Sequence, residues 1–89
     1  MKTIRQISSF KRDLKRVKKR SKNLNKLYEI VEKLAKDINL EPYNRPHKLT
    51  GNYVNKWECH IEPDWLLIYE VTDDLVILYR TGTHADLFD

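Results

Sequence analysis

The segment 24–38 carries apolar residues at helical spacing and constrains the fold more than any other part of the chain. Its apolar side chains recur every three or four positions and so share one face of a helix: Leu24, Leu27, Tyr28, Val31, Leu34, Ala35 and Ile38. In an earlier helical segment Phe10, Leu14 and Val17 share a face, and either Ser8 or Ser9 could cap its N-terminus. A short link at 21–23 predicts that the two helices pair antiparallel.

Three segments in the C-terminal half have the pattern of β-strands. Trp57, Cys59 and Ile61 alternate with polar residues, and 65–71 and 75–80 are nearly continuous apolar runs. Turn-forming residues separate these runs. The sequence therefore predicts three consecutive strands joined by tight turns.

Two further segments complete the predicted order of elements. Residues 2–7 suit a short strand, and 41–55, which holds two prolines and a glycine, predicts a loop. The order β-α-α-β-β-β indicates an α+β fold, a small and mainly antiparallel sheet with two N-terminal helices packed on one face. With 89 residues the chain is expected to form one domain, 1–89.

The last two predicted strands are apolar on both faces, although two helices can cover only one face of a sheet. The other face must be sheltered by the 41–55 loop, by the C-terminal tail or by a partner. Cys59, the single cysteine, cannot form an internal disulfide, and its alternation with Trp57 indicates a core position.

Charge is divided unevenly along the chain. Residues 1–36 hold 13 Lys and Arg against 3 Asp and Glu, whereas residues 37–89 hold 4 against 10. Such a basic block attracts polyanions, although a lysine-rich solvated helix face is the simpler interpretation. No apolar run approaches the roughly 20 residues of a membrane span, and no secretory signal opens the chain, so we expect a cytoplasmic protein that does not contact membranes.

A group of residues suited to proton transfer lies in the C-terminal half. His60 and Asp64 flank one turn, while Arg80 ends the last strand and His84 follows a few residues later. In a meander these four residues converge, and His47 joins them only if its loop folds back. Histidine can act as general acid or base near neutral pH, and arginine binds phosphate, so the set fits phosphodiester cleavage with 2′-OH attack.

Each of these residues also has a simpler interpretation. A histidine in a strand is often structural, and two histidines with a carboxylate can bind a divalent metal, although the spacing here is not the usual helical one. Arg80 could pair with Asp73 or Asp86 on the surface. Trp65 and Phe88 could be core residues or could stack on a base.

Two C-terminal motifs resemble those of a known family. The segment 58–69, ECHIEPDWLLIY, and the segment 80–88, RTGTHADLF, look like the hallmarks of the YafQ-type toxins of the RelE/ParE superfamily. The segments 10–16, 18–20 and 47–51 are similar to the family too, so the resemblance covers nearly the whole chain.

This resemblance implies the toxin of a type II toxin–antitoxin system, a ribosome-dependent endoribonuclease that cuts mRNA in the A site without a metal or cofactor. Matched by motif, the acid–base positions are His47, His60, Asp64 and His84. Arg80 matches the arginine that contacts phosphate, and Trp65 and Phe88 match aromatic residues of the site. His84 is the candidate general acid, whereas the choice of base among Asp64, His47 and His60 stays open.

The resemblance also implies partners. The basic helices would contact ribosomal RNA through Lys11, Arg12, Lys15, Arg16, Lys18, Lys19, Arg20 and Lys22. A cognate antitoxin of the RelB or DinJ type would neutralise the toxin, and the complex could bind operator DNA through that antitoxin. The alternative is a non-catalytic member of the superfamily, either a ParE-like toxin that inhibits gyrase or an inert binding module.

Overall fold

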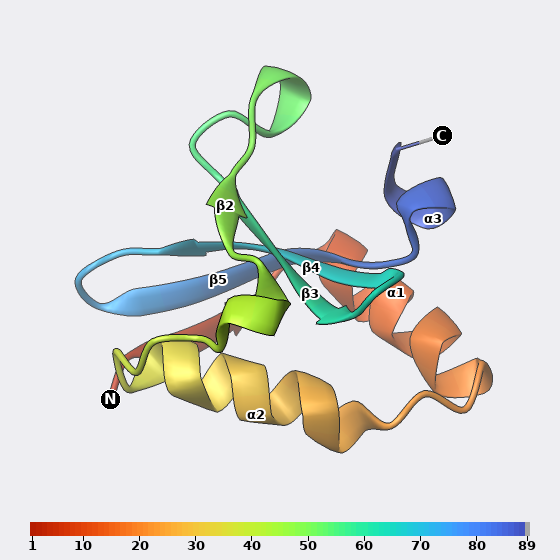
Figure 1. The fold of residues 1–89 in the computed structure, drawn as a ribbon, viewed down its shortest axis with the longest axis horizontal. Coiled ribbons are helices and arrows are strands. Elements are labelled where there is room, and N and C mark those ends of the chain that lie inside the picture. The colour runs from red at the N-terminus through yellow and green to blue at the C-terminus, as the bar shows by residue number, and fades with distance from the viewer. Residues whose placement is uncertain (89) are drawn as a thin grey trace.

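A five-stranded sheet with the two long helices on one face forms the framework of the molecule (Figure 1). The computed structural model describes residues 1–88 of the 89. The elements in chain order are β1 (Thr3–Gln6), α1 (Ser8–Lys19), α2 (Leu24–Ala35), η1 (Pro42–Asn44), β2 (His47–Lys48), η2 (Gly51–Tyr53), β3 (Trp57–Glu62), β4 (Trp65–Val71), β5 (Leu75–Gly82) and α3 (His84–Phe88).

The strand order is β1-β5-β4-β3-β2, with β1 parallel to β5 and the other neighbours antiparallel. The predicted α+β class and mainly antiparallel sheet are therefore confirmed. The predicted loop 41–55 is wrong in one respect, because its residues 47–48 form a fifth strand on the edge beside β3. The C-terminal tail also differs from the prediction, since it contains the short helix α3.

The main core lies between α1, α2 and one face of the sheet. Phe10 and Val17 of α1 and Leu27 of α2 pack there against alternate residues of the strands. The strand residues of this core are Cys59, Ile61, Trp65, Leu67, Tyr69, Val76 and Leu78. Their spacing of two along each strand confirms the predicted alternation of β3 and puts Cys59 in the core.

The opposite face of the sheet is covered by the chain's own segments. Leu66 and Ile68 of β4 are fully buried there, and Leu87 of α3 packs over them with Leu49 and Tyr53. Figure 1 shows β2, the loop after it and α3 rising on the side of the sheet opposite α2. Of the three coverings left open by the sequence, both internal ones are therefore present.

The helix boundaries differ from those expected. The N-cap of α1 is Ile7, so neither predicted serine caps the helix. The hydroxyl of Ser9 instead donates to the Tyr79 carbonyl at 2.7 Å. Helix α2 ends at Ala35, since Asp37 has a left-handed φ of 57°, and Ile38 is consequently half exposed rather than on the buried face. Within residues 1–88 no helix is long and apolar enough to cross a membrane.

Candidate active site

His84 and Asp64 form a close pair at one end of the sheet. Asp64 lies in the turn between β3 and β4, and His84 is the first residue of α3. One Asp64 oxygen, Oδ1, accepts hydrogen bonds from the backbone N and from Nδ1 of His84, both at 3.0 Å. The backbone bond, and then the side-chain bond, lower the pKa of Asp64 below its usual value. The carboxylate is therefore ionised at neutral pH.

His60 and Phe88 lie next to this pair. The ring centroids of His60 and His84 are 5.9 Å apart, and the Nδ1 atom of His60 lies 3.1 Å from the Pro63 carbonyl oxygen. Phe88 is 46% exposed, with its ring centroid 6.2 Å from that of His84. The predicted convergence of His60, Asp64 and His84 is therefore found, with one exposed aromatic ring beside them.

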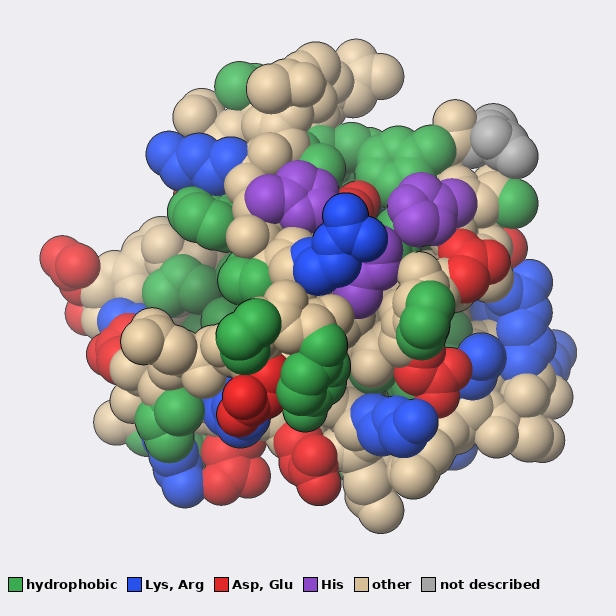
Figure 2. Space-filling view, in the orientation of Figure 1, with side chains coloured by type: hydrophobic (Ala, Val, Ile, Leu, Met, Phe, Trp, Pro, Cys, Tyr) green, Lys and Arg blue, Asp and Glu red, His purple; other side chains and the backbone are tan. Residues whose placement is uncertain are grey.

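His47 reaches the same face because β2 folds back along β3. His47 pairs with Glu58, Glu58 with Ile68, and Ile68 with Arg80, so these residues form one row across four strands. Figure 2 shows the three histidines on one face of the molecule, with Lys or Arg surface between them. At a strand spacing of about 4.8 Å, His47 and Arg80 are roughly 14 Å apart, at opposite ends of the row.

Glu58 is a site residue that the sequence did not single out. Its side chain is 5% exposed, and Oε1 lies 3.3 Å from Nε2 of His47. The Nδ1 atom of His47 lies 2.8 Å from the Arg45 carbonyl oxygen, which can only accept, so Nδ1 carries a proton. His47 is thus held between a backbone carbonyl and a buried carboxyl group, which fixes the orientation of its ring on this face.

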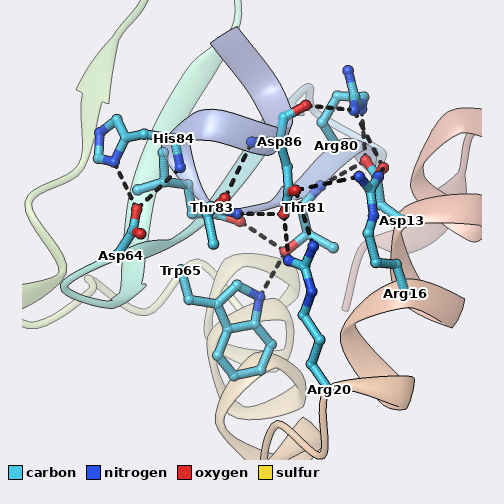
Figure 3. A network of polar contacts seen from close by, with 11 residues as sticks. Asp13, Arg16, Arg20, Asp64, Trp65, Arg80, Thr81, Thr83, His84 and Asp86 are labelled. Carbon is cyan, nitrogen blue, oxygen red and sulfur yellow. Dashed lines mark hydrogen bonds and ion pairs between the residues drawn. The ribbon is translucent and has the colours of Figure 1, made fainter. Parts of the chain in front are cut away.

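Arg80 is held by a buried carboxylate on α1. Asp13 accepts from Nε of Arg80 at 2.6 Å and from Nη2 at 3.2 Å, and its Oδ2 also accepts from the Thr81 backbone N (Figure 3). The hydrogen bonds from Arg80 to Asp13 raise the pKa of Arg80. The Nη1 atom is on the side of Tyr53, 3.5 Å from its hydroxyl. Asp13 thus replaces the surface partners suggested by the sequence, although the backbone oxygen of Asp86 lies 3.5 Å from Nη2.

A second carboxylate, Asp86, fixes α3 to α1. It accepts from the Thr83 backbone N at 2.9 Å while its own backbone N donates to Thr83 Oγ1, which is a reciprocal capping box. The same carboxylate binds Arg20 at 2.6 Å and Arg16 at 3.4 Å, and the bond from Arg20 contributes most to lowering the pKa of Asp86. A Cβ at Gly82 would lie 2.7 Å from Oδ2 of Asp86, so the close approach requires glycine there.

The predicted role of Trp65 as an aromatic residue lining the site is wrong. Its side chain is 1% exposed, and the indole N–H donates to Thr81 Oγ1 at 2.9 Å inside the core. Because β4 is apolar on both faces, the sequence could not show which way the ring points. In the structure it points toward the helices, on the face opposite the histidines, so it cannot stack on a base.

The predicted basic surface divides into two groups. Arg16, Arg20 and Lys22 are engaged by Asp13, Asp86 and Glu62. The others are exposed on α1 and have no carboxylate partner within residues 1–88: Lys11, Arg12, Lys15, Lys18 and Lys19. Helical spacing puts these five on one side of α1, away from the core.

The residues that the structure describes contain no group of three or more His, Cys, Asp or Glu side chains placed to hold one metal ion. The histidines instead make pairwise contacts with a carboxylate or a backbone oxygen. The arrangement is suited to moving protons beside a bound phosphate, with basic groups on the same face.

Comparison with known proteins places this geometry in a family. The model for the bacterial toxin YafQ of type II toxin–antitoxin systems matches residues 2–89. The chain belongs to this family. It is 40% identical over 80 residues to the mRNA interferase toxin YafQ of Escherichia coli strain K12, which covers 89% of this chain and 87% of the relative. The prediction of an enzyme of the mRNA interferase class, an endoribonuclease, is confirmed by this relative.

Solved structures of bacterial toxins have the same fold. YafQ in the DinJ–YafQ toxin–antitoxin complex of E. coli has a TM-score of 0.90 and 37% identity, covering 99% of this chain and 98% of that one. A metal-bound toxin from Helicobacter pylori has a TM-score of 0.92 and 37% identity, covering 99% of this chain and 100% of that one. The first similarity supports the prediction of a cognate antitoxin partner.

Proposed function

We propose that this chain cleaves mRNA in the ribosomal A site, by attack of the ribose 2′-OH on the adjacent phosphate with acid–base catalysis and without a metal. One observation carries the proposal, namely the exposed pair of His84 and ionised Asp64 next to the ring of His60. Two imidazoles at this separation can act on the two sides of one phosphodiester.

His84 is the general acid of this mechanism. Asp64 accepts a hydrogen bond from Nδ1, so Nε2 points away from the carboxylate, toward solvent and substrate. In the imidazolium form Nε2 donates its proton to the departing 5′-oxygen, and Asp64 stabilises the positive ring. Asp64 orients the acid in the way that a carboxylate orients histidine in a catalytic triad.

His60 is the base that the geometry favours. Its Nδ1 donates to the Pro63 carbonyl, which leaves the Nε2 lone pair to accept the 2′-OH proton. Asp64 is already engaged by His84, and both ring nitrogens of His47 already have partners, the Arg45 carbonyl and the Glu58 carboxyl group. Arg80 contacts the phosphate through Nη1, with Asp13 fixing the other side of the guanidinium.

A substrate with a 5′-bridging sulfur tests the assignment of acid and base. The sulfur leaves without a proton, so this substrate does not need a general acid. We expect His84→Gln and His60→Gln each to slow cleavage of normal mRNA by about 10²–10⁴-fold on ribosomes. The sulfur substrate should restore cleavage by His84→Gln and leave His60→Gln slow. Restoration of both variants, or of neither, would contradict these roles, and thermal unfolding checks that both variants fold.

The absence of a metal requirement is tested separately. With Mg²⁺ kept at the level that ribosomes need, a chelator selective for transition metals should leave the cleavage rate unchanged. Inhibition that is reversed by adding one such metal would show that a metal takes part. This control is needed because the similar H. pylori toxin was solved with metal bound.

The proposed partners follow from the same function. The exposed lysines and arginines of α1 bind ribosomal RNA, with Phe88 beside the mRNA at the site. A RelB- or DinJ-like antitoxin neutralises the toxin in the cytoplasm, and the complex binds operator DNA through that antitoxin. Coexpression of a small acidic-tailed protein encoded next to this chain should abolish growth arrest, and continued arrest would contradict that pairing.

A further inference from the structure

A pocket opens beside His60. It has a volume of about 310 Å³ and is lined by Tyr43, Arg45, His60, Ile61, Glu62 and Pro63. The end of β3 and the turn after it supply one wall, and η1 and its connection to β2 supply the other. His60 lines this pocket and is also the proposed general base, so the pocket is continuous with the proposed catalytic group.

Arg45 places an uncommitted positive charge at this pocket. Within residues 1–88 its guanidinium has no carboxylate partner, whereas Arg80 is bound by Asp13 and Arg20 by Asp86. The backbone of Arg45 is well fixed, since its N donates to the Pro42 carbonyl and its own carbonyl accepts from His47. It adopts a left-handed φ of 49°, which few residues other than glycine do, and Pro46 follows it.

The rest of the pocket suits a nucleotide. Tyr43 is 74% exposed and presents an aromatic ring at the rim, the kind of group on which bases stack. The one acidic lining residue, Glu62, is bound by Lys22 at 2.9 Å and Lys26 at 3.0 Å, so its charge is compensated. The pocket is therefore positive at Arg45 and aromatic at Tyr43.

We propose that this pocket binds the mRNA nucleotide next to the cleaved linkage, with Arg45 on its phosphate and Tyr43 stacked on its base. The inference rests on the proposed nuclease function and names a subsite of it. Arg45 supplies the phosphate contact that Arg80 makes only in part, because Asp13 occupies two nitrogens of the Arg80 guanidinium.

A chemical scan of the substrate tests the subsite. The probes are 2′-O-methyl oligonucleotides that bind without being cut, each with one neutral methylphosphonate linkage or one abasic position, presented free and in the A site of programmed ribosomes. At one linkage, the methylphosphonate should lower the affinity of the wild type and of Arg45→Lys for the oligonucleotide. Arg45→Gln should bind the modified and the unmodified oligonucleotide equally well. At the neighbouring nucleotide, base removal should cost the wild type and Tyr43→Phe at least about fivefold in affinity. Tyr43→Ala should be insensitive to that change.

Matched controls lie outside the site. Arg5→Gln on β1, at the opposite edge of the sheet from β2, and Tyr28→Ala on α2 should respond to every probe as the wild type does. The subsite is overturned if each substrate modification lowers the affinity of Arg45→Gln and Tyr43→Ala by the same factor as that of the wild type. Cleavage of mRNA by the wild type would still support the nuclease function in that case. If the wild type binds no probe in either format and cuts no mRNA, both proposals fall.

Discussion

Asp13 is a buried carboxylate that joins the first helix to the last strand. Four hydrogen bonds reach its two oxygens, from Nε and Nη2 of Arg80, from Arg16 and from the Thr81 backbone. A carboxylate that is 2% exposed is stable only when it is paired in this way. Asp13 therefore determines both the position of Arg80 and the packing of α1 on β5.

We expect Asp13→Asn to lower the free energy of unfolding by about 3 kcal/mol, because it leaves the Arg80 guanidinium partly buried without its counter-charge. Urea unfolding followed by circular dichroism measures the change. Asp74→Asn, in the exposed turn before β5, removes the same charge and should alter stability by less than about 0.5 kcal/mol. Equal stability of the two variants would show that the Asp13 network contributes little.

At the same scale, Glu58 and Trp65 show what residue patterns could not reveal. The alternation of β3 indicated a polar, solvated side for Glu58, yet β2 and the following loop cover that side and bury the carboxyl group. The residues that follow Trp65 in β4 are apolar on both faces of the strand, so no alternation of polar and apolar residues showed which face Trp65 is on. Both errors arise because burial on the second face depends on segments distant in sequence.

At the scale of elements, periodicity predicted what is long and regular. The two helices, the three consecutive strands and the N-terminal strand were all predicted from spacing and turn residues. Strand β2 has only two residues, between a proline and a threonine-glycine turn, and carries no periodic signal of its own. Helix α2 ends at Ala35, shortly before a non-glycine left-handed residue, Asp37, which composition does not mark.

Helix α3 is too short to be stable alone and depends on Asp86. With five residues it lies below the length at which isolated helices form, so its capping box and the bonds to Arg20 and Arg16 hold His84 in place. The pKa of Asp86 is lower in the folded protein than the roughly 3.9 of an unfolded chain. Its contribution to stability is therefore complete above about pH 4 and declines as the pH falls further.

Asp86→Asn should accordingly destabilise the fold by about 1–2 kcal/mol at neutral pH, and this difference from the wild type should shrink as the pH falls from about 4 towards 2. Urea unfolding at a series of pH values measures it. Asp73→Asn, in an exposed turn, provides the control. A difference that stays constant across this range would mean that the ionised carboxylate is not what holds α3.

At the scale of the whole molecule, the uneven charge of the sequence is only partly available to a partner. Acidic residues of the C-terminal half engage Arg16, Arg20, Lys22 and Lys26, so part of the basic block stabilises the fold rather than binding anything outside it. The composition alone could not separate these residues from the exposed ones. The five exposed residues of α1 remain as the face that we propose binds ribosomal RNA.

Replacing three residues of that face should weaken ribosome binding without unfolding the protein. We expect the triple variant Lys11→Gln, Lys15→Gln, Lys18→Gln to reduce the slope of log affinity against log salt concentration by about 2, because up to three phosphate contacts and their counterions are lost. Its stability should change by less than about 1 kcal/mol, since all three side chains are exposed. The slope comes from binding to purified ribosomes at several salt concentrations.

The matched control is the triple variant Arg5→Gln, Lys33→Gln, Lys36→Gln, which removes the same charge from β1, from α2 and from the residue that follows α2. If only the net charge of the protein matters, the salt slope should fall equally in the two triple variants. If ribosomal RNA contacts a defined face of α1, the slope should fall only in the variant of Lys11, Lys15 and Lys18. Because Lys33 and Lys36 already pair with Glu41 and Glu32, their counterions are largely internal and little is released on binding. If the salt slope fell by the same amount in the two triple variants, ribosome recognition would lie outside α1. The basic helix would then act only through its net charge.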